Sequence, residues 1–518
     1  MIFQYGEDQL TVGKALAILR GTLPTEVNAT TRERLERAHE VVLAVAGKSR
    51  PTYGINTGFG PLCNVKVDAK DTVSLQRKLL LSHSVGMGEP IAPELAKLMM
   101  ILKVHALCRG YSGIAPRVIE RLRWQIAEDV IPVVPEQGSV GASGDLAPLS
   151  HLFLPLLGEG EVFYRGQRRP AAAVLREHQL EPVELHPKAG LALINGTQFI
   201  LAHAVLLVER LQNALTNADL IAALMVEGLQ ASAMPFHPAL HATRPFRGVV
   251  HVAARIHQFL RGSEIMQGHA NCERVQDPYS LRCVPQVHGA SRNAWLHLRE
   301  MVETEMNSVT DNPVVFDEDL IISGGSFHGQ PLALPLDYAC LAAAEIGSIS
   351  DRRSYFALHG IPGVAPKLLV EKSGLDSGLM IVQYTSAALV SENKTMCFPA
   401  SADSIPTSLG QEDHVSMGSI SGRKALRVVR NLEKILGVEL FCAAQAFDFQ
   451  RPLKSSPVLE AIHARVRQDI AHAADDRIYA TDLRAATELV RSGALTAIAR
   501  AHQNKAYSAY DELFEDLG

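Results

Sequence analysis

The sequence predicts a mainly helical protein, and three observations point to this class. From about residue 197 onward, most segments repeat their apolar residues with the 3.6-residue period of a helix. Several of these segments exceed 20 residues and are apolar on more than one face, so they must bury against other helices within or between chains. The 518 residues are 47% hydrophobic and 20% charged, which is enough apolar material for a large core.

The predicted long helices follow one another with short interruptions and without a repeat of solenoid type. They cover residues 198–230, 288–309, 331–358, 378–396, 420–449, 457–474 and 480–503. We expect a bundle domain over residues 201–518, preceded by a domain over residues 1–200 that contains a small amount of β structure.

The N-terminal part begins with shorter helical patterns. Residues 32–45 form one pattern, and Thr30 or Thr31 is the expected N-cap. An amphipathic helix follows over 73–81, and residues 91–130 have the pattern of two more helices. Residues 161–167 have the alternation and the glycine of a short hairpin.

A loop of small residues follows the two helices predicted over 91–130. Its sequence is Gly-Ser-Val-Gly-Ala-Ser-Gly-Asp-Leu, at residues 138–146. Its glycines allow the backbone to fold closely on itself, because no Cβ atom obstructs it. An apolar helical pattern starts at Leu146, so the loop leads into a helix N-terminus. We expect Asp145 to cap or complement the positive end of that helix.

This geometry permits an unusual reaction within Ala142-Ser143-Gly144. The Gly144 nitrogen can attack the Ala142 carbonyl carbon, and loss of water closes a ring. Loss of a second water from Ser143 leaves a methylidene group conjugated to that ring. Glycine is needed at position 144 because a side chain would crowd the ring.

If only Ala142-Ser143-Gly144 is considered, other interpretations of this loop remain open. Ala-Ser-Gly alone is more often a plain turn before a helix, and a non-catalytic helical assembly could retain the loop without cyclising it. A serine-hydrolase elbow is excluded, because the residue two positions beyond Ser143 is Asp145 and the G-x-S-x-G spacing fails.

The longer stretch over residues 138–151, which ends in Leu-Ala-Pro-Leu-Ser-His, resembles the signature of the aromatic amino acid ammonia-lyases. The resemblance implies that Ala142-Ser143-Gly144 becomes a methylidene-imidazolone (MIO) autocatalytically, without an external cofactor. It also implies an ammonia-lyase-like fold with a long central helix bundle. The family forms homotetramers whose active sites draw residues from three chains, so the bundle domain would form the oligomer core.

Further motifs that match the family carry the other expected site residues. Tyr53 lies on a glycine-rich loop (residues 51–61) that we expect to act as a lid, and it would remove the β-proton; the alternative is a loop tyrosine that packs its ring. The resemblance places Asn195 beside the electrophile, Tyr279 near the substrate amine and Arg282 on its carboxylate. It also places Gln276 and Phe327 in the wall of the substrate pocket.

Two residues indicate the substrate. Ser82-His83 resembles histidine-type members and some tyrosine-type members but not phenylalanine-type ones, although a plain helix-terminal cap is the commoner explanation for such a histidine. Glu412 stands where phenylalanine- and tyrosine-type members have Gln, and a carboxylate suits an imidazole better than a benzene ring. We expect elimination of ammonia from L-histidine to give trans-urocanate. The alternatives are a tyrosine or phenylalanine ammonia-lyase, or an aromatic aminomutase.

Composition excludes several other classes. The net charge of −5 does not suggest a nucleic-acid partner. The 20 histidines include no H-E-x-x-H and no paired Cys/His spacing, so no metal site is expected. Charged residues interrupt the N-terminal apolar runs, and polar residues interrupt the uncharged run 189–208, so we expect a cytoplasmic protein outside the membrane. The acidic residues 511–518 remain unexplained.

Overall fold

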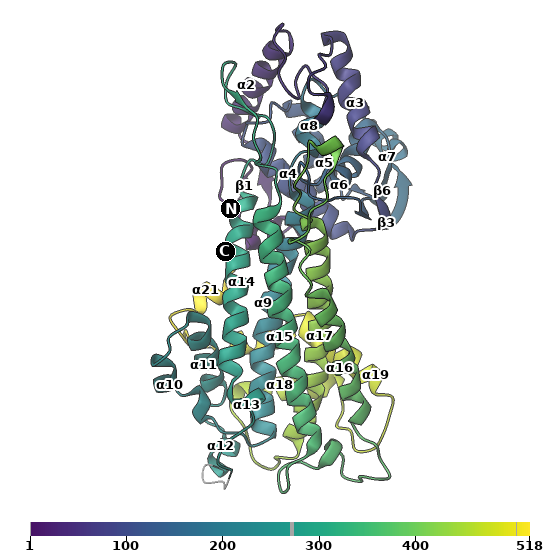
Figure 1. Ribbon diagram of the computed structural model, residues 1–518. Helices are drawn as coiled ribbons and strands as arrows, with labels where there is room; N and C mark the ends of the chain where they lie inside the picture. Colours follow the sequence, from purple (N-terminus) through teal and green to yellow (C-terminus); the bar gives the residue numbers. More distant parts are fainter. Residues whose placement is uncertain (1, 270–273, 504) are drawn as a thin grey trace.

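The computed structural model describes residues 2–269, 274–503 and 505–518, and it shows a head of short elements above a bundle of long helices (Figure 1). The chain is mainly helical, as the periodicity predicted. The bundle contains four long helices and three shorter ones beside them. These are α9 (Gln198–Gly228), α14 (Val284–Met306), α15 (Gln330–His359) and α17 (Gly418–Asp448), with α16 (Met380–Met396), α18 (Pro457–Asp469) and α19 (Tyr479–Arg491).

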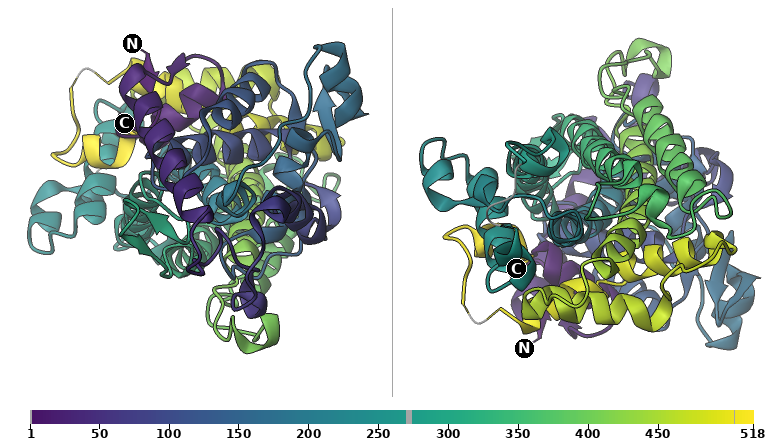
Figure 2. Two further views of the ribbon diagram at one scale, coloured as in Figure 1. Left: turned by 90° about the horizontal axis from the view of Figure 1, so that it is seen from above. Right: turned by 90° about the horizontal axis from the view of Figure 1, so that it is seen from below.

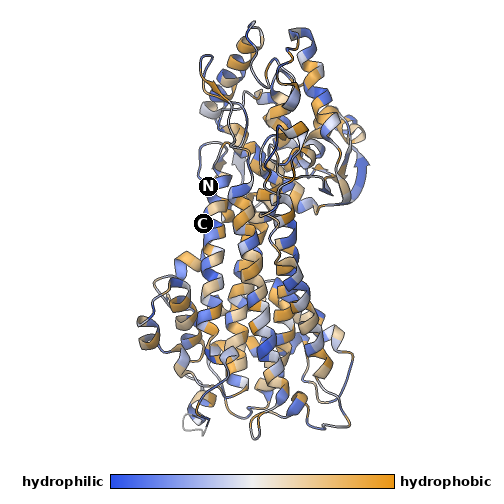
Figure 3. Ribbon diagram, in the orientation of Figure 1, coloured by the Kyte–Doolittle hydropathy of each residue, from blue (hydrophilic) through white to orange (hydrophobic). Residues whose placement is uncertain are grey.

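The bundle forms because its helices bury apolar residues on several faces. Nearly all residues of α9 and most residues of α17 are buried, and alanine, leucine and valine are common among them. Orange apolar segments lie along the inner helices in Figure 3. By length and composition alone, α15 could cross a membrane. However, 67% of its apolar window is buried inside the protein, as in the core helix of a bundle.

The head holds the first eight helices and most of the β structure. Its helices are α1 (Val12–Leu19), α2 (Ala29–Ala46), α3 (Thr72–His83), α4 (Pro93–Cys108), α5 (Pro116–Ala127), α6 (Leu146–Phe153), α7 (Ala171–Glu177) and α8 (Ala189–Ile194). The predicted hairpin is confirmed as β6 (Glu161–Tyr164) and β7 (Gln167–Pro170), which β4 (Ile131–Pro132) extends to three strands. The other strands form pairs: β1 (Phe3–Gln4) with β2 (Thr25–Glu26), β3 (Met87–Pro90) with β5 (Pro135–Gln137), and β8 (Val314–Val315) with β9 (Ile321–Ile322).

Views along the bundle show what projects from it. In Figure 2, the β6–β7 hairpin lies on one side and α10 (Pro238–Ala242), α11 (Arg247–Phe259) and α12 (Glu264–Gly268) lie on the other. The main hydrophobic core contains residues from both sides of position 200. The division into domains 1–200 and 201–518 therefore stays a prediction.

Three local predictions were wrong. The N-cap of α2 is Asn28 instead of Thr30 or Thr31, because its side chain accepts a hydrogen bond from the Thr31 nitrogen at 2.9 Å. The single helix predicted over 480–503 is two, α19 and α20 (Ala494–Ala501), because Gly493 between them is left-handed with φ +72°. Residues 279–282, expected in a loop, form the short helix α13 (Tyr279–Arg282).

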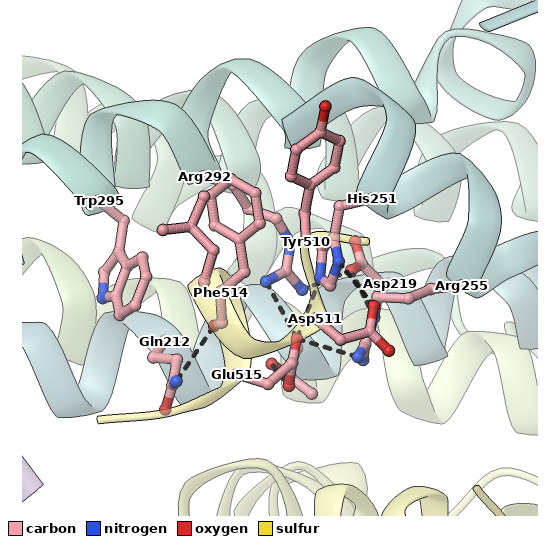
Figure 4. A network of polar contacts seen from close by, with 12 residues as sticks. Gln212, Asp219, His251, Arg255, Arg292, Trp295, Tyr510, Asp511, Phe514 and Glu515 are labelled. Carbon is pink, nitrogen blue, oxygen red and sulfur yellow. Dashed lines mark hydrogen bonds and ion pairs between the residues drawn. The ribbon is translucent and has the colours of Figure 1, made fainter. Parts of the chain in front are cut away.

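The acidic C-terminal segment is part of the fold. Its helix α21 (Asp511–Glu515) lies against α9, α11 and α14, where Phe514 is fully buried (Figure 4). The Glu515 carboxylate accepts from Arg255 at 2.9 Å and from Arg292 at 3.3 Å. His251 lies 3.2 Å from both Asp511 and Glu515. Asp219 of α9 also pairs with Arg255 and Arg292, at 3.3 and 2.6 Å, so the negative charges of this segment add to one carboxylate inside the bundle.

Candidate active site

A pocket of about 590 Å³ opens in the head beside the N-terminus of α9, and five of the expected site residues line it. They come from five separate segments of the chain. These residues are Tyr53, His83, Ser143, Asn195 and Glu412.

The loop over residues 138–146 has the close backbone contacts that its glycines predicted. Ser143 and Gly144 are both left-handed, with φ +48° and +79°. A Cβ atom on Gly144 would lie 2.0 Å from the Gly196 carbonyl oxygen, so this position accepts only glycine. The Gly196 nitrogen also donates to the Ser143 carbonyl oxygen at 3.3 Å. The backbone of the Asn195-Gly196 turn is thus in direct contact with the backbone of Ser143 and Gly144.

Asp145 caps a different helix from the one predicted. It occupies the N-cap position of α6, but its side chain makes no hydrogen bond to that helix. Instead, one carboxylate oxygen accepts from the Phe199 and Ile200 nitrogens at 3.1 and 3.0 Å, at the start of α9. Complete burial raises the pKa of Asp145 to about 7. Its contacts tie the loop to α9, one of the long helices of the bundle.

Glu412 faces the Ser143 hydroxyl. That hydroxyl donates to one Glu412 carboxylate oxygen at 3.0 Å, although 269 residues separate the two positions. The other carboxylate oxygen accepts from the hydroxyls of Thr407 and Ser408 at 2.9 and 2.8 Å. These bonds come from a tight turn just before Glu412, and they fix the carboxylate in the pocket.

His83 ends α3 and points its ring into the pocket wall. Its Nδ1 donates to the Leu79 carbonyl oxygen at 2.9 Å, so Nε2 of the neutral ring is an acceptor. Burial lowers the pKa of His83, while the Leu79 carbonyl and the Glu412 charge act in the opposite direction. The neutral, accepting form is therefore favoured.

Tyr53 closes the side of the pocket that the glycine-rich loop forms. The Gly60 nitrogen donates to the Tyr53 hydroxyl oxygen at 3.5 Å. Burial raises the pKa of Tyr53, and the Glu412 charge contributes in the same direction. A positive charge in the pocket would lower it again.

Asn195 offers an unused acceptor. Its Nδ2 donates to the Asn312 carbonyl oxygen at 2.7 Å, which fixes the side chain. Its Oδ1 is buried and has no hydrogen-bond partner among the described residues. A buried acceptor in a pocket wall is a site for a donor on a bound molecule, since an unpaired polar atom is costly.

Six expected site residues are not in the pocket lining: Ala142 and Gly144, which flank Ser143 in the loop, and four residues from other segments. Gln276, Tyr279 and Arg282 lie in or beside α13, at the end of the bundle opposite the head (Figure 1). They contact one another: Arg282 donates to the Gln276 side chain at 3.0 Å, and its guanidinium lies 4.6 Å from the Tyr279 ring centre. Residues 271–273 of the same motif lie outside the described residues.

Phe327 is the fourth, and it is half-buried in the loop over 323–329. This loop reaches the pocket only indirectly, because the Gly324 nitrogen donates to the Asn312 side chain at 2.9 Å. In a single chain, the expected site is therefore divided into a head part and a distal part.

The sequence did not suggest the polar cluster behind Asn195. Lys103 donates to the Asn195 carbonyl oxygen, and Lys188 bonds to Asp311 at 2.5 Å. A lysine within the apolar run of α4 was the available signal, because a helix buried on all sides rarely carries an unpaired charge.

A metal site finds no support in the described residues, which contain no group of three or more His, Cys, Asp or Glu arranged for one. His328 and His414 stack with their ring centres 5.8 Å apart. Both side chains are explained by this contact and by the bond of His328 to the His414 carbonyl oxygen at 3.3 Å.

Comparisons with known proteins agree with this geometry. The family model for aromatic amino acid lyase matches residues 10–468. A histidine ammonia-lyase of Myxococcus xanthus is 44% identical over 494 residues, which are 95% of this chain and 97% of that protein. The crystal structure of a histidine ammonia-lyase from Trypanosoma cruzi superposes with a TM-score of 0.90 at 38% identity, covering 100% of this chain and 97% of that one.

A structure with a different activity is also similar. The tyrosine aminomutase of Streptomyces globisporus has a TM-score of 0.91 at 33% identity, and 98% of this chain and 100% of that chain are covered. The backbone alone thus does not separate the two activities, and the pocket residues have to do so.

Proposed function

The chain belongs to the aromatic amino acid lyase family, and we propose that it is a histidine ammonia-lyase, a carbon–nitrogen lyase that converts L-histidine to trans-urocanate and ammonia. One observation carries the choice of substrate. The Glu412 carboxylate lies in the pocket, 3.0 Å from the Ser143 hydroxyl. Near-full-length similarity to a curated histidine ammonia-lyase supports the same choice over the aminomutase.

Glu412 and His83 recognise the imidazole in this proposal. An imidazole carries N–H donors and can be protonated, so a carboxylate gains a charge-assisted hydrogen bond from it. A benzene ring would leave the same carboxylate desolvated and unpaired, which is costly. The Nε2 atom of His83 provides an acceptor on the wall. The unpaired Oδ1 of Asn195 accepts from the substrate amine.

The loop fits the MIO group that its family uses. Ser143 and Gly144 have left-handed backbones, and the Gly196 carbonyl excludes any side chain at position 144. The group would supply an uncharged electrophile that no unmodified side chain provides. Ala142, Ser143 and Gly144 would form it, and the Asn195-Gly196 turn would hold it in place.

In this proposal, Tyr53 removes the β-proton of the substrate. Its hydroxyl is in the pocket, and no other phenol is in the described lining. Burial alone raises its pKa and disfavours the phenolate. The positive charge of a bound substrate or of an arginine nearby opposes that effect, so the base becomes competent when the site is filled.

The distal part of the site requires a second chain. Arg282 is the natural bidentate partner for an α-carboxylate, yet it lies at the far end of the bundle from Ser143 (Figure 1). We propose a homotetramer in which Arg282, Tyr279, Gln276 and Phe327 enter the pocket of neighbouring chains. The bundle has a surface for this assembly, because α15 and α16 expose large apolar side chains at Leu334, Tyr338, Leu341, Ile381 and Tyr384.

Assay of the purified protein with L-histidine, L-tyrosine and L-phenylalanine tests the function. Released ammonia, the unsaturated acid and any β-amino acid are measured for each substrate. We expect turnover of L-histidine with ammonia and urocanate in equal amounts. Turnover of L-tyrosine in preference to L-histidine, or formation of a β-amino acid, would refute the proposal.

A further inference from the structure

Two lysines are buried behind the pocket. Lys103 in the middle of α4 is 2% exposed, and Lys188 at the start of α8 is 0% exposed. A buried ammonium group is costly unless it is paired. Lys188 has such a partner, because it bonds to the Asp311 carboxylate at 2.5 Å and to the Ser112 carbonyl oxygen at 3.2 Å.

Lys103 has a different arrangement. Its ammonium donates to a backbone carbonyl, that of Asn195. The carbonyl belongs to the Asn195–Gly196 peptide, whose N–H donates to the Ser143 carbonyl oxygen at 3.3 Å. One peptide group therefore lies between the ammonium of Lys103 and the carbonyl of Ser143.

We propose that Lys103 is a positioning residue for maturation of the Ala142-Ser143-Gly144 loop, which it promotes by holding and polarising the Asn195–Gly196 peptide. This inference depends on the proposed function, because it concerns the ring that the lyase reaction needs. A charged donor on a peptide oxygen withdraws electrons from that peptide, so its N–H becomes a stronger donor.

The chemistry of maturation shows where such a donor acts. In the first step, the Gly144 nitrogen bonds to the Ala142 carbonyl carbon. The oxygen of that carbonyl then leaves as water with the amide protons of Gly144 and Ser143. In the second step, the Ser143 Cα proton departs, its electron pair forms the Cα=Cβ bond, and the hydroxyl leaves as water. No oxidant or reductant is required.

The second step places negative charge on the Ser143 carbonyl oxygen. Loss of the Cα proton next to a carbonyl delocalises the electron pair onto that oxygen, which accepts the Gly196 N–H. A donor at the position where charge develops lowers the barrier. Burial lowers the pKa of Lys103 to about 7, whereas Asp311 and Asp145 favour its charged form and Lys188 opposes it.

The test compares Lys103→Met with Lys188→Met, a matched loss of a buried lysine that does not contact the Asn195 carbonyl. Full-length protein is made in timed cell-free synthesis below pH 7. The mass of the loop peptide and the thermal midpoint are recorded for each variant. We expect wild-type protein to lose two waters. We expect Lys103→Met to slow that loss by about tenfold or more, as befits a hydrogen bond to a charged group.

The control separates maturation from stability. Lys188→Met leaves Asp311 unpaired, so it should lower the thermal midpoint more than Lys103→Met while its loop still loses two waters. Lys103→Arg, which keeps the cation, should restore most of the rate. If Lys103→Met does not fold, the rate of water loss is measured for Lys103→Gln instead, because Gln keeps a hydrogen-bond donor without the charge.

Two outcomes would overturn the inference and leave the proposed function intact. One is maturation of Lys103→Met at the wild-type rate. The other is loss of maturation in both lysine variants in proportion to their thermal midpoints, which a purely structural role predicts. An unmodified loop in active, urocanate-forming wild-type protein would refute maturation itself, whereas an unmodified and inactive wild type would refute the proposed function.

Discussion

Substitution of Glu412 by Gln tests the proposal that this residue selects the substrate. The amide cannot form the charge-assisted bond with an imidazole, so we expect kcat/KM for L-histidine to fall by about 10- to 100-fold. Folding should change little, because the Gln carbonyl oxygen can still accept from Thr407 and Ser408 while its amide nitrogen donates to the Ser143 hydroxyl oxygen. Steady-state kinetics and a thermal midpoint check both expectations.

Asp413→Asn is the matched control for Glu412, since it removes an exposed neighbouring carboxylate outside the pocket. It should leave kcat/KM unchanged. Equal kinetics for wild type and Glu412→Gln would exclude Glu412 from substrate recognition.

Substitution of Ser143 by Ala removes the hydroxyl that must leave during maturation. The variant should fold and assemble, because the hydroxyl makes a single bond to Glu412, but it should lose most of its activity. Intact-mass measurement should not find the loss of two waters, because the second water comes from the Ser143 hydroxyl. Substantial turnover by this variant would show that the reaction does not need the electrophile.

At the scale of the element, α21 is the segment whose stability depends most clearly on charge. Burial raises the pKa of Glu515, but Arg255, His251 and Arg292 together outweigh that effect and lower the pKa from 4.5 to about 2. A carboxylate with a lowered folded-state pKa stabilises the fold above its unfolded pKa, and the contribution disappears as the pH falls through the folded value. The C-terminal contact should thus weaken between pH 4.5 and pH 2.

Glu515→Gln should reproduce this loss at neutral pH. Removing one partner of a buried ion pair costs about 3 kcal/mol, because Arg255 and Arg292 lose one of their two counter-charges and keep only Asp219. The difference in unfolding free energy from wild type, measured in urea, should narrow as the pH drops from 4.5 to 2. Glu512→Gln, on the exposed side of the same helix, should have little effect; a constant difference at every pH would contradict the charge argument.

Whole elements were predicted well where burial sets the pattern. The periods over 198–230, 331–358 and 420–449 correspond to α9, α15 and α17 within a few residues. Prediction failed where one backbone conformation decides, as at Gly493, or where the side chain bonds outside its own helix. Asp145 is the second kind: its sequence position suggests α6, but tertiary packing brings the start of α9 to its carboxylate.

At the scale of the molecule, complementation tests whether one active site needs two chains. Ser143→Ala and Arg282→Met are each expected to be inactive. Co-expressed, they should regain roughly a quarter of wild-type activity, because random assembly pairs an intact Ser143 with an intact Arg282 in that share of the sites. Hybrid tetramers isolated through two tags allow the measurement.

Ser143→Ala with Glu412→Gln is the control pair. Both residues line the pocket of one chain, so co-expression should give no more activity than the Glu412→Gln chains contribute. Absence of activity in the Ser143/Arg282 hybrids would place the distal residues outside the site.

The sequence by itself determined the helical class, the loop at 138–146 and the membership of the family. These follow from periods, glycines and contiguous residue types, which are local properties of a chain. Five residues that the sequence predicts for one site lie around one pocket: Ser143, Tyr53, His83, Asn195 and Glu412. Their roles there stay predictions.

Only the tertiary structure decided which residues support that site and which cannot reach it. The bond between Ser143 and Glu412 joins positions 269 residues apart, and the bond from Lys103 to Asn195 crosses 92 residues. Arg282 matches the same family pattern, but the length of the bundle separates it from Ser143 (Figure 1). Distance in space depends on how long helices pack, and no local pattern encodes it.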